Sequence, residues 1–389
     1  MKHFPSTLSH NGVLRFEALP APPYYAGLVL SGIVTVLLGP ILPVVSSQWG
    51  LTDAQAGSLF TAQFTGSIFG SILSSYHRRR SVVGGYAAIA SGLAALALAN
   101  YHAGLIGMFL IGAGIGAAVT ATNLIFGNEY PEIRGRLLTR TNFFWGVGAV
   151  TAPQLVAMTE RHHALQLFLF VLAAATLLIC LRFVPLIKAS AAVHYEDIPI
   201  ETERGNLRIF VLFSMMLFLY VGCETTIAGW IATYMHRVES FSIARSSEIV
   251  SFFWLAIVAG RAISPLLLRA FLELPVLLGS IGLALAGLSF LLTRHSVSIT
   301  LAAVVVTGFG CASIFPLITS RLLGRVGRSR RTGWVFAICG SGGAVIPWLT
   351  GFLSQHTGSL STAFSVPLLG LAAIILCVLV ESIGSFRGH

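Results

Sequence analysis

One carboxylate stands out because it lies deep inside a long apolar segment. Glu224 occurs in the stretch Tyr220-Val-Gly-Cys-Glu224-Thr-Thr-Ile-Ala-Gly-Trp230, which holds no other charged residue. An ionisable group is costly inside hydrocarbon, so it commonly has a function or a partner there. We expect Glu224 to carry a proton or a cation, or to accept hydrogen bonds from the hydroxyls of a solute. A structural acid, bonded to nearby backbone or to a buried arginine, remains the alternative.

Aromatic residues share this segment with the carboxylate. Tyr220 and Glu224 are four residues apart, which places them on one face of a helix. Trp230 and Tyr234 follow two and three turns later and add aromatic surface. Aromatic rings against the C–H faces of a sugar, with carboxylates and amides on its hydroxyls, would form a sugar site. Packing in the core or at the membrane interface is the other interpretation of these rings.

Other polar side chains lie in apolar segments of the first half of the chain. Buried amides need hydrogen-bond partners, so each is a candidate for solute contact or for a bond to a neighbouring helix. The candidates are Gln63, Asn123, Asn142 and Trp145, with Trp254, Trp334 and Trp348 as weaker ones in the second half. Arg261 follows Gly260 inside a further apolar segment, where it either extends to the interface or pairs with an acid as a gate.

The elements that must position these residues are membrane spans. Of 389 residues, 55% are hydrophobic and 10% charged, and the mean hydropathy is +0.84. Soluble domains contain about 25% charged residues. Because one span needs about 20 apolar residues, the pattern predicts twelve transmembrane helices. We place them at 24–47, 55–76, 81–100, 103–126, 138–158, 163–183, 208–235, 246–269, 273–293, 296–320, 331–353 and 360–382.

The basic residues predict the orientation of these spans. They concentrate in alternate loops, while the opposite loops contain only Arg161, Arg237, Arg245 and Arg294. Loops rich in lysine and arginine usually face the cytoplasm, so we expect both termini to be cytoplasmic. A polar stretch at 184–207 predicts a cytoplasmic linker between an N-terminal six-helix bundle, 1–183, and a C-terminal one, 208–389. Residues 1–23 lack an apolar core, so we expect no cleaved signal peptide.

The two halves repeat one another around spans 5 and 11. Gly146, Gly148 and Pro153 recur as Gly340, Gly342 and Pro347, each pair 194 positions apart (347 minus 153). The same offset relates Arg134 to Arg328 and Arg136 to Arg330. Duplicated halves are typical of transporters, which bind their solute between the halves near mid-membrane. The repeat therefore predicts two pseudo-symmetric bundles.

Several classes of function are disfavoured by the sequence. The net charge of +10 is spread over loops rather than one domain, so we expect no nucleic-acid partner. The five cysteines lie in apolar runs without metal-ligand spacing, which predicts neither a metal site nor a disulfide framework. No phosphate-binding loop or catalytic constellation is recognisable. We therefore expect no enzyme activity and no cofactor.

The organisation and several motifs resemble the major facilitator superfamily, and within it the fucose permease branch of sugar:proton symporters. The match rests on the Gly146–Pro153 pattern of span 5, the Tyr220–Glu224 and Gly229-Trp230 pattern of span 7, and Gly260-Arg261 of span 8. The resemblance implies alternating access in a bundle of two halves. One departure is clear: span 1 has no acid, and Val119 occupies the place where the branch has a coupling glutamate in span 4.

Together these observations predict a transporter of a sugar or sugar-like solute. Glu224 is the candidate for coupling to a proton or to sodium, and without such coupling the protein would be a uniporter. An exporter of drugs or other amphipathic metabolites is the alternative within transport. A solute receptor that does not transport is the alternative from another class. We expect a multi-pass protein of the lipid bilayer, in a bacterial inner membrane, that is functional as a monomer.

Overall fold

The structure, a computed structural model, describes residues 22–74, 76–129, 133–188, 207–293, 296–326 and 330–386. Within these residues the chain forms helices joined by short turns, and no strand occurs. The core is a continuous set of buried apolar side chains from both halves of the chain. Large apolar residues on the outer surface, such as Leu178 and Leu376, are more than half exposed, as expected of side chains that face lipid.

The first half contains seven helices. These are α1 (Pro22–Val36), α2 (Leu38–Trp49), α3 (Asp53–Ser74), α4 (Arg78–Leu96), α5 (Tyr101–Glu129), α6 (Arg134–Glu160) and α7 (Leu165–Lys188). Helices α1 and α2 form one span that is bent by 45°. The bend lies next to Pro40 and Pro43, which lack the backbone N–H that would continue the helical hydrogen bonds. The first span is therefore a broken helix.

The second half repeats this arrangement with eight helices. These are α8 (Leu207–Arg237), α9 (Ile243–Ala270), α10 (Glu273–Leu291), α11 (Val297–Cys311), α12 (Ile314–Val326), α13 (Arg330–Thr357), α14 (Leu360–Ala363) and α15 (Ser365–Phe386). Helices α11 and α12 belong to one apolar stretch that is interrupted at Ala312 and Ser313. Pro316 cannot donate to the carbonyl of Ala312, which gives this span its break.

The prediction of twelve spans is confirmed. By length and hydropathy, eight segments of the described chain qualify as spans, and nine do when α1 and α2 count as one. The remaining three are α3, α4 and α6, which are 22, 19 and 27 residues long. Helices of that length reach about 30 Å, the thickness of the hydrocarbon core. They are less apolar because all three are rich in Gly and in Ser or Thr, and because α4 and α6 contain arginines in their first two turns.

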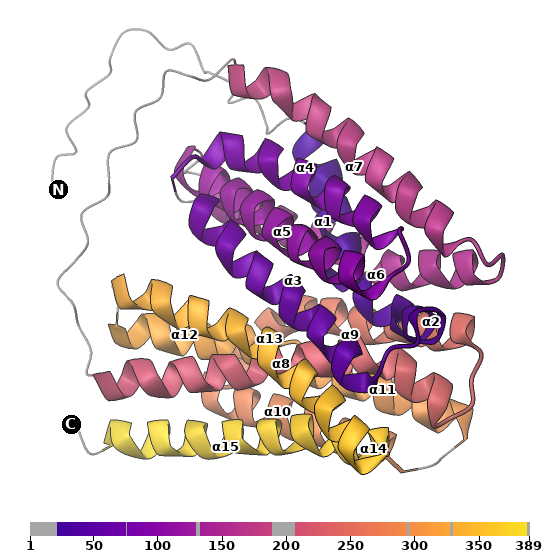
Figure 1. The fold of residues 1–389 in the computed structure, drawn as a ribbon. Coiled ribbons are helices and arrows are strands. Elements are labelled where there is room, and N and C mark those ends of the chain that lie inside the picture. The colour runs from indigo at the N-terminus through magenta and orange to yellow at the C-terminus, as the bar shows by residue number, and fades with distance from the viewer. Residues whose placement is uncertain are drawn as a thin grey trace, which may run out of the picture.

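The spans form two bundles, one from α1–α7 and the other from α8–α15 (Figure 1). Between the bundles, α3 packs on α13, α6 packs on α9, and α2 packs on α8 and α9. The predicted domain boundaries remain predictions. Helix α7 extends to Lys188, past the predicted linker start at 184, and the linker residues 189–206 lie outside the described residues.

Because successive spans run in opposite directions, each span has one terminus at either end of the molecule. The distal end of the molecule is the end at which α2, α6, α8 and α13 finish and at which α3 and α9 start. The near end is the opposite one, where α1 and α8 start and α7 and α15 finish. In Figure 1 the distal end lies on the right, where α2 and α14 are labelled.

Candidate functional site

Glu224 lies near the middle of α8, and its closest charged neighbour is Arg261 of α9. The distance between Glu224 Oε1 and Arg261 Nη2 is 3.6 Å, and the side chains are 15% and 33% exposed. This separation is an ion pair but too long for a hydrogen bond. Of the interpretations left open by the sequence, the pairing of Arg261 with an acid is the one that the structure supports.

The pair leaves hydrogen-bonding capacity unused. Glu224 Oε1 and Arg261 Nε are shielded from solvent and have no hydrogen-bond partner among the described residues. The same holds for the indole Nε1 of Trp254, which lies seven residues before Arg261 on the same face of α9. A buried unsatisfied polar group costs about 1–3 kcal/mol. Three of them on two neighbouring helices indicate a place that water or a polar ligand completes.

Trp145 of α6 lies against Trp254 in an edge-to-face arrangement. Their ring centroids are 5.7 Å apart and the planes meet at 80°. Trp145 is half-buried and Trp254 is 8% exposed. Since α6 and α9 belong to different bundles, this aromatic pair crosses the interface of the halves. Sequence reasoning ranked Trp254 below Trp145, because nothing in the local pattern shows which ring carries an unpaired N–H.

Tyr220, one turn before Glu224 on α8, supports the broken span of α11 and α12. Its hydroxyl donates to the carbonyl oxygen of Cys311 at 2.7 Å, where α11 ends. The side chain is fully buried. Backbone carbonyls at a helix break inside a membrane need such donors. Tyr220 therefore stabilises the break beside the Glu224–Arg261 pair.

Gln63 makes the corresponding bond at the break between α1 and α2. Its Nε2 donates to the carbonyl oxygen of Thr35 at 3.1 Å, and its side chain is buried. Trp230 is also fully buried, and its Nε1 donates to the carbonyl of Pro347 at 3.1 Å. In this conformation both side chains are engaged in packing between helices. Their predicted contact with solute remains a prediction.

The two asparagines lie apart from the ion pair. Asn142 is exposed on α6, where its Nδ2 donates to the carbonyl of Leu138 in its own helix at 3.0 Å. Asn123 is half-buried on α5. In the described part of the chain no hydrogen bond or ion pair joins Gln63, Asn123 or Asn142 to Glu224. Their assignment to one common site stays a prediction.

Metal chemistry finds no support in the described residues. No group of three or more His, Cys, Asp or Glu side chains there could hold a metal ion. The cysteines Cys223, Cys311 and Cys339 are buried free thiols of the second half.

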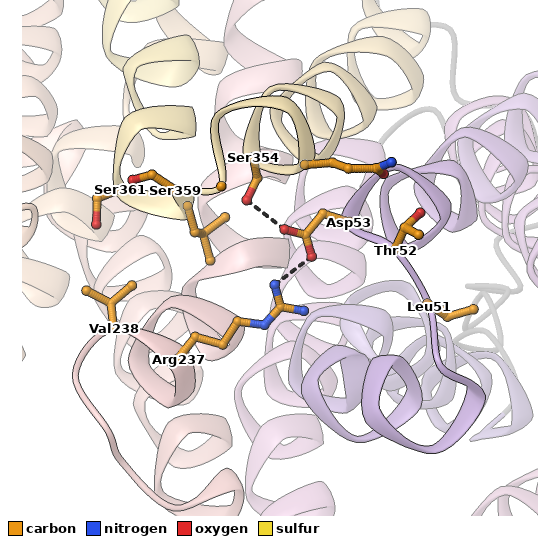
Figure 2. Close-up of a pocket in the computed structure, with 11 residues that line it drawn as sticks. Leu51, Thr52, Asp53, Arg237, Val238, Ser354, Ser359 and Ser361 are labelled. Atoms are coloured by element: carbon orange, nitrogen blue, oxygen red, sulfur yellow. Dashed lines mark hydrogen bonds and ion pairs between the residues drawn. The ribbon is translucent and has the colours of Figure 1, made fainter.

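Sequence reasoning missed a set of polar contacts between the bundles at the distal end. Arg237 of α8 donates a hydrogen bond to the carboxylate of Asp53 in α3 at 2.6 Å (Figure 2). Arg161, just after α6, forms an ion pair with Glu248 of α9. Arg161 and Arg237 entered the sequence analysis only as loop charges. A carboxylate near the start of spans 2 and 8, opposite those arginines, was the signal that could have found the pairs.

The chain matches the Major Facilitator Superfamily over residues 24–327. It is 25% identical to a putative glucose/galactose transporter of Helicobacter pylori (strain J99), covering 87% of this chain and 91% of the relative. It is 24% identical to the glucose/mannose transporter GlcP of Bacillus subtilis (strain 168), covering 90% and 93%.

Among solved structures the fold is similar to that of the E. coli fucose:proton symporter FucP. The TM-score is 0.60 at 19% identity, covering 92% of this chain and 97% of that one. At this identity the likeness concerns the fold alone. The resemblance drawn from the sequence is thus confirmed, and the protein is a multi-pass membrane transporter rather than an enzyme. With two six-span bundles and a family match over most of its length, the chain belongs to the major facilitator superfamily.

Proposed function

We propose that this protein moves a sugar or sugar-like solute across the membrane by alternating access of two bundles. The proposal is carried by three of the six buried side-chain polar atoms of α8 and α9 that lack a hydrogen bond among the described residues, namely Glu224 Oε1, Arg261 Nε and Trp254 Nε1. They comprise one acceptor and two donors, and the indole that carries one of the donors, that of Trp254, packs against Trp145. A sugar hydroxyl both donates and accepts, so it suits such a mixed set.

The named relatives support the same class of solute. Two proteins that align with about nine-tenths of the chain are a putative glucose/galactose transporter and a glucose/mannose transporter. Hexoses are therefore the first solutes to test. An exporter of amphipathic compounds would not need an acceptor and donors that are arranged to bind hydroxyl groups.

Coupling to an ion would proceed through Glu224. A proton or sodium ion on the carboxylate cancels or screens its attraction to Arg261, which lies 3.6 Å away. Ion binding and the ion pair therefore compete for the same oxygens. A solute hydroxyl that bonds the same carboxyl group also weakens the ion pair, so solute and ion bound together would loosen one contact between α8 and α9. This competition gives a physical route from binding to conformational change.

The experiment is uptake of labelled hexoses into liposomes that contain the purified protein, with and without an imposed proton or sodium gradient. Uptake that one gradient drives would support symport and name the ion. Saturable uptake that neither gradient changes would support uniport, with Glu224 as a binding group. Absence of uptake for every hexose, in either direction, would contradict the sugar assignment and favour export of other solutes.

We also propose that both termini and the linker 184–207 face the cytoplasm of a bacterium, and that one chain completes the path. Arg78, Arg79 and Arg80 start α4 at the near end, and both relatives named above are bacterial. Single cysteines at the exposed Tyr76 and Ser298, labelled in intact cells by a membrane-impermeant reagent, test this orientation. We expect reaction at residue 298 only, since the near end would be inside.

A further inference from the structure

Span 10, which consists of α11 and α12, changes its neighbours at its break. Helix α11 packs on both α9 and α10, whereas α12 packs on α8 and α10. At the break itself α9 is still in contact, since Ser264 Oγ and Ser313 Oγ are hydrogen bonded at 2.8 Å. A Cβ on Gly260 of α9 would also lie 2.5 Å from Cβ of Ala312. Toward the near end, α8 therefore replaces α9 as a neighbour of the span.

An apolar groove lies where α12 has turned away from α9. It has a volume of about 370 Å³ and separates the end of α9 from the first half of α10. Its apolar walls include Leu267, Phe271, Pro275, Val276, Leu283 and Phe309. The rim is open, because Phe271 is 60% and Leu283 is 38% exposed. The floor reaches Ser313, which is 4% exposed, so the groove runs from the surface of the bundle to the break.

The groove offers little to a polar ligand. Among the described residues that line it, only Ser280 and Ser313 have polar side chains, and the hydroxyl of Ser313 is already bonded to Ser264. A sugar or a group of water molecules would lack hydrogen-bond partners there. An unfilled gap would cost the walls their dispersion contacts. The lining therefore fits a hydrocarbon chain.

The position of the groove matches one leaflet of the bilayer. Helix α9 finishes and α10 starts at the near end, so the groove begins at the level of the lipid head groups. From Pro275 to Leu283 it follows α10 over eight positions (283 minus 275), a rise of about 12 Å. One leaflet of the hydrocarbon core is about 15 Å thick. An acyl chain that enters at the near end can therefore reach the break.

A positive charge accompanies the near end of the groove. Arg269 lies in the last turn of α9, between Leu267 and Phe271 in the sequence, and is exposed. It has no hydrogen bond or ion pair within the described part of the chain. A long arginine side chain at a helix end can extend to the membrane interface. The carboxylate of Glu273, at the start of α10, is bonded to Ser320 of α12, so Arg269 is available to the phosphate of a lipid.

We infer that a phospholipid of the leaflet at the near end places one acyl chain in this groove, against the break of span 10, with its phosphate near Arg269. The chain fills the space that α12 would otherwise occupy beside α9, so it stabilises the bent form of the span. That bend lies next to the Glu224–Arg261 pair, because Tyr220, one turn before Glu224, donates to the carbonyl of Cys311. The inference does not depend on the identity of the solute.

Two glycines of α10 provide a matched pair of variants. A Cβ at Gly279 or at Gly282 would meet no atom within 4 Å. Of the two, only Gly279 lines the groove. Gly279→Phe therefore fills the groove without a clash, while Gly282→Phe places the same ring on the same helix outside it.

The probe is phosphatidylglycerol with a diazirine at the end of one acyl chain. It is added to vesicles of phosphatidylethanolamine and phosphatidylglycerol that contain the protein, and adducts formed on irradiation are mapped by mass spectrometry. We expect adducts to concentrate near Phe309 at the floor of the groove. Gly279→Phe should lose them and Gly282→Phe should keep them. Adducts at Leu178 of α7, an exposed apolar residue of the other bundle, should be equal in all three proteins.

Thermal stability in detergent gives a second measurement. Adding phosphatidylglycerol to the delipidated protein should raise the Tm of the wild type and of Gly282→Phe, but not that of Gly279→Phe. Arg269→Gln should need about fivefold more lipid for the same rise, since it removes one basic residue near an anionic head group. An unchanged lipid requirement in Arg269→Gln would overturn the placement of the phosphate.

Two results would overturn the inference as a whole. One is a set of adducts spread evenly over exposed apolar residues, or retained in Gly279→Phe protein that elutes as a folded species. The other is a wild-type groove without adducts together with a shift of Gly279→Phe from dimer to monomer on size exclusion, which would assign the groove to a second copy of the chain. Because neither measurement contains a hexose, failure here is distinct from failure to transport one.

Discussion

Two ion pairs of this transporter differ in how completely their atoms are used. At the distal end, Asp53 bonds Arg237 at 2.6 Å and its second oxygen accepts from Ser354. In the centre of α8, Glu224 stands 3.6 Å from Arg261, and an atom of each side chain lacks a hydrogen bond. A fully bonded cluster is suited to holding a conformation, whereas an incompletely bonded pair is suited to receiving a ligand. Carboxylate–arginine pairs in one protein can therefore have different tasks.

Glu224→Gln should produce the largest effect. The amide keeps the size of the side chain but removes its charge and one acceptor site, so solute hydroxyls lose a strong partner and Arg261 is left unpaired. We expect hexose uptake to fall about 100-fold, in line with the loss of a buried polar contact to substrate. Glu273→Gln, a carboxylate at the start of α10 that bonds Ser320, is the control and should transport normally. Normal uptake by Glu224→Gln would remove the carboxylate from the site.

Asp53→Asn should act differently, on rate rather than on affinity. It weakens the distal ion pair while leaving the atoms of the central pair in place. We expect a change of about fivefold in the maximal rate of uptake, with the KM for hexose altered less than twofold. Concentration-dependent uptake into proteoliposomes separates the two parameters. A large rise in KM with an unchanged rate would place Asp53 in the solute path and erase the contrast with Glu224.

Trp254→Phe tests whether the unpaired indole N–H serves the solute. Phenylalanine keeps an aromatic ring against Trp145 but has no donor. If a solute hydroxyl accepts from Nε1, the KM rises about fivefold, the equivalent of one hydrogen bond. Trp334→Phe is the matched control, since Trp334 is 72% exposed on the outer surface of α13. Equal KM values for both variants would show that the Trp254 N–H is satisfied by water alone.

Tyr220→Phe should have the smallest effect. It deletes the hydroxyl that donates to the Cys311 carbonyl at the break between α11 and α12. We expect a loss of about 1–2 kcal/mol in stability, seen as a lower Tm in detergent. Tyr76→Phe, on an exposed turn after α3, should leave the Tm unchanged. An unaltered Tm for Tyr220→Phe would mean that water replaces the hydroxyl at the break.

The sequence predicted the twelve spans because apolar length and hydropathy act locally and must satisfy the membrane. Glu224 and Arg261 were also found from sequence, since a charge inside an apolar run is conspicuous. Their pairing was only one of the alternatives that the sequence left open, because the choice depends on how α8 rotates against α9. Likewise Gln63 and Trp230 appeared as free polar or aromatic groups. Their bonds to the carbonyls of Thr35 and Pro347 arise from helix packing that no local pattern reports.

The distal ion pairs Asp53–Arg237 and Arg161–Glu248 were missed for a related reason. Asp53 and Arg237 are far apart in the chain and both flank loops, where charges are ordinarily solvated. Only the closed arrangement of the two bundles brings them together. The repeat at an offset of 194 positions was visible in the glycines and prolines. The same offset relates Arg161, just after α6, to Gln355 in the last turn of α13 (355 minus 161).

Equilibrium binding of a labelled hexose to the purified protein tests the central claim most directly. The claim is that the incompletely bonded central pair receives the solute while the distal ion pairs only hold the two bundles together. We predict that wild type and the double variant Asp53→Asn, Arg161→Gln bind the hexose with affinities within about tenfold of each other, and that Glu224→Gln binds at least about 100-fold more weakly. Undiminished binding by Glu224→Gln, with binding lost in the double variant, would contradict the account and move the solute site to the distal end.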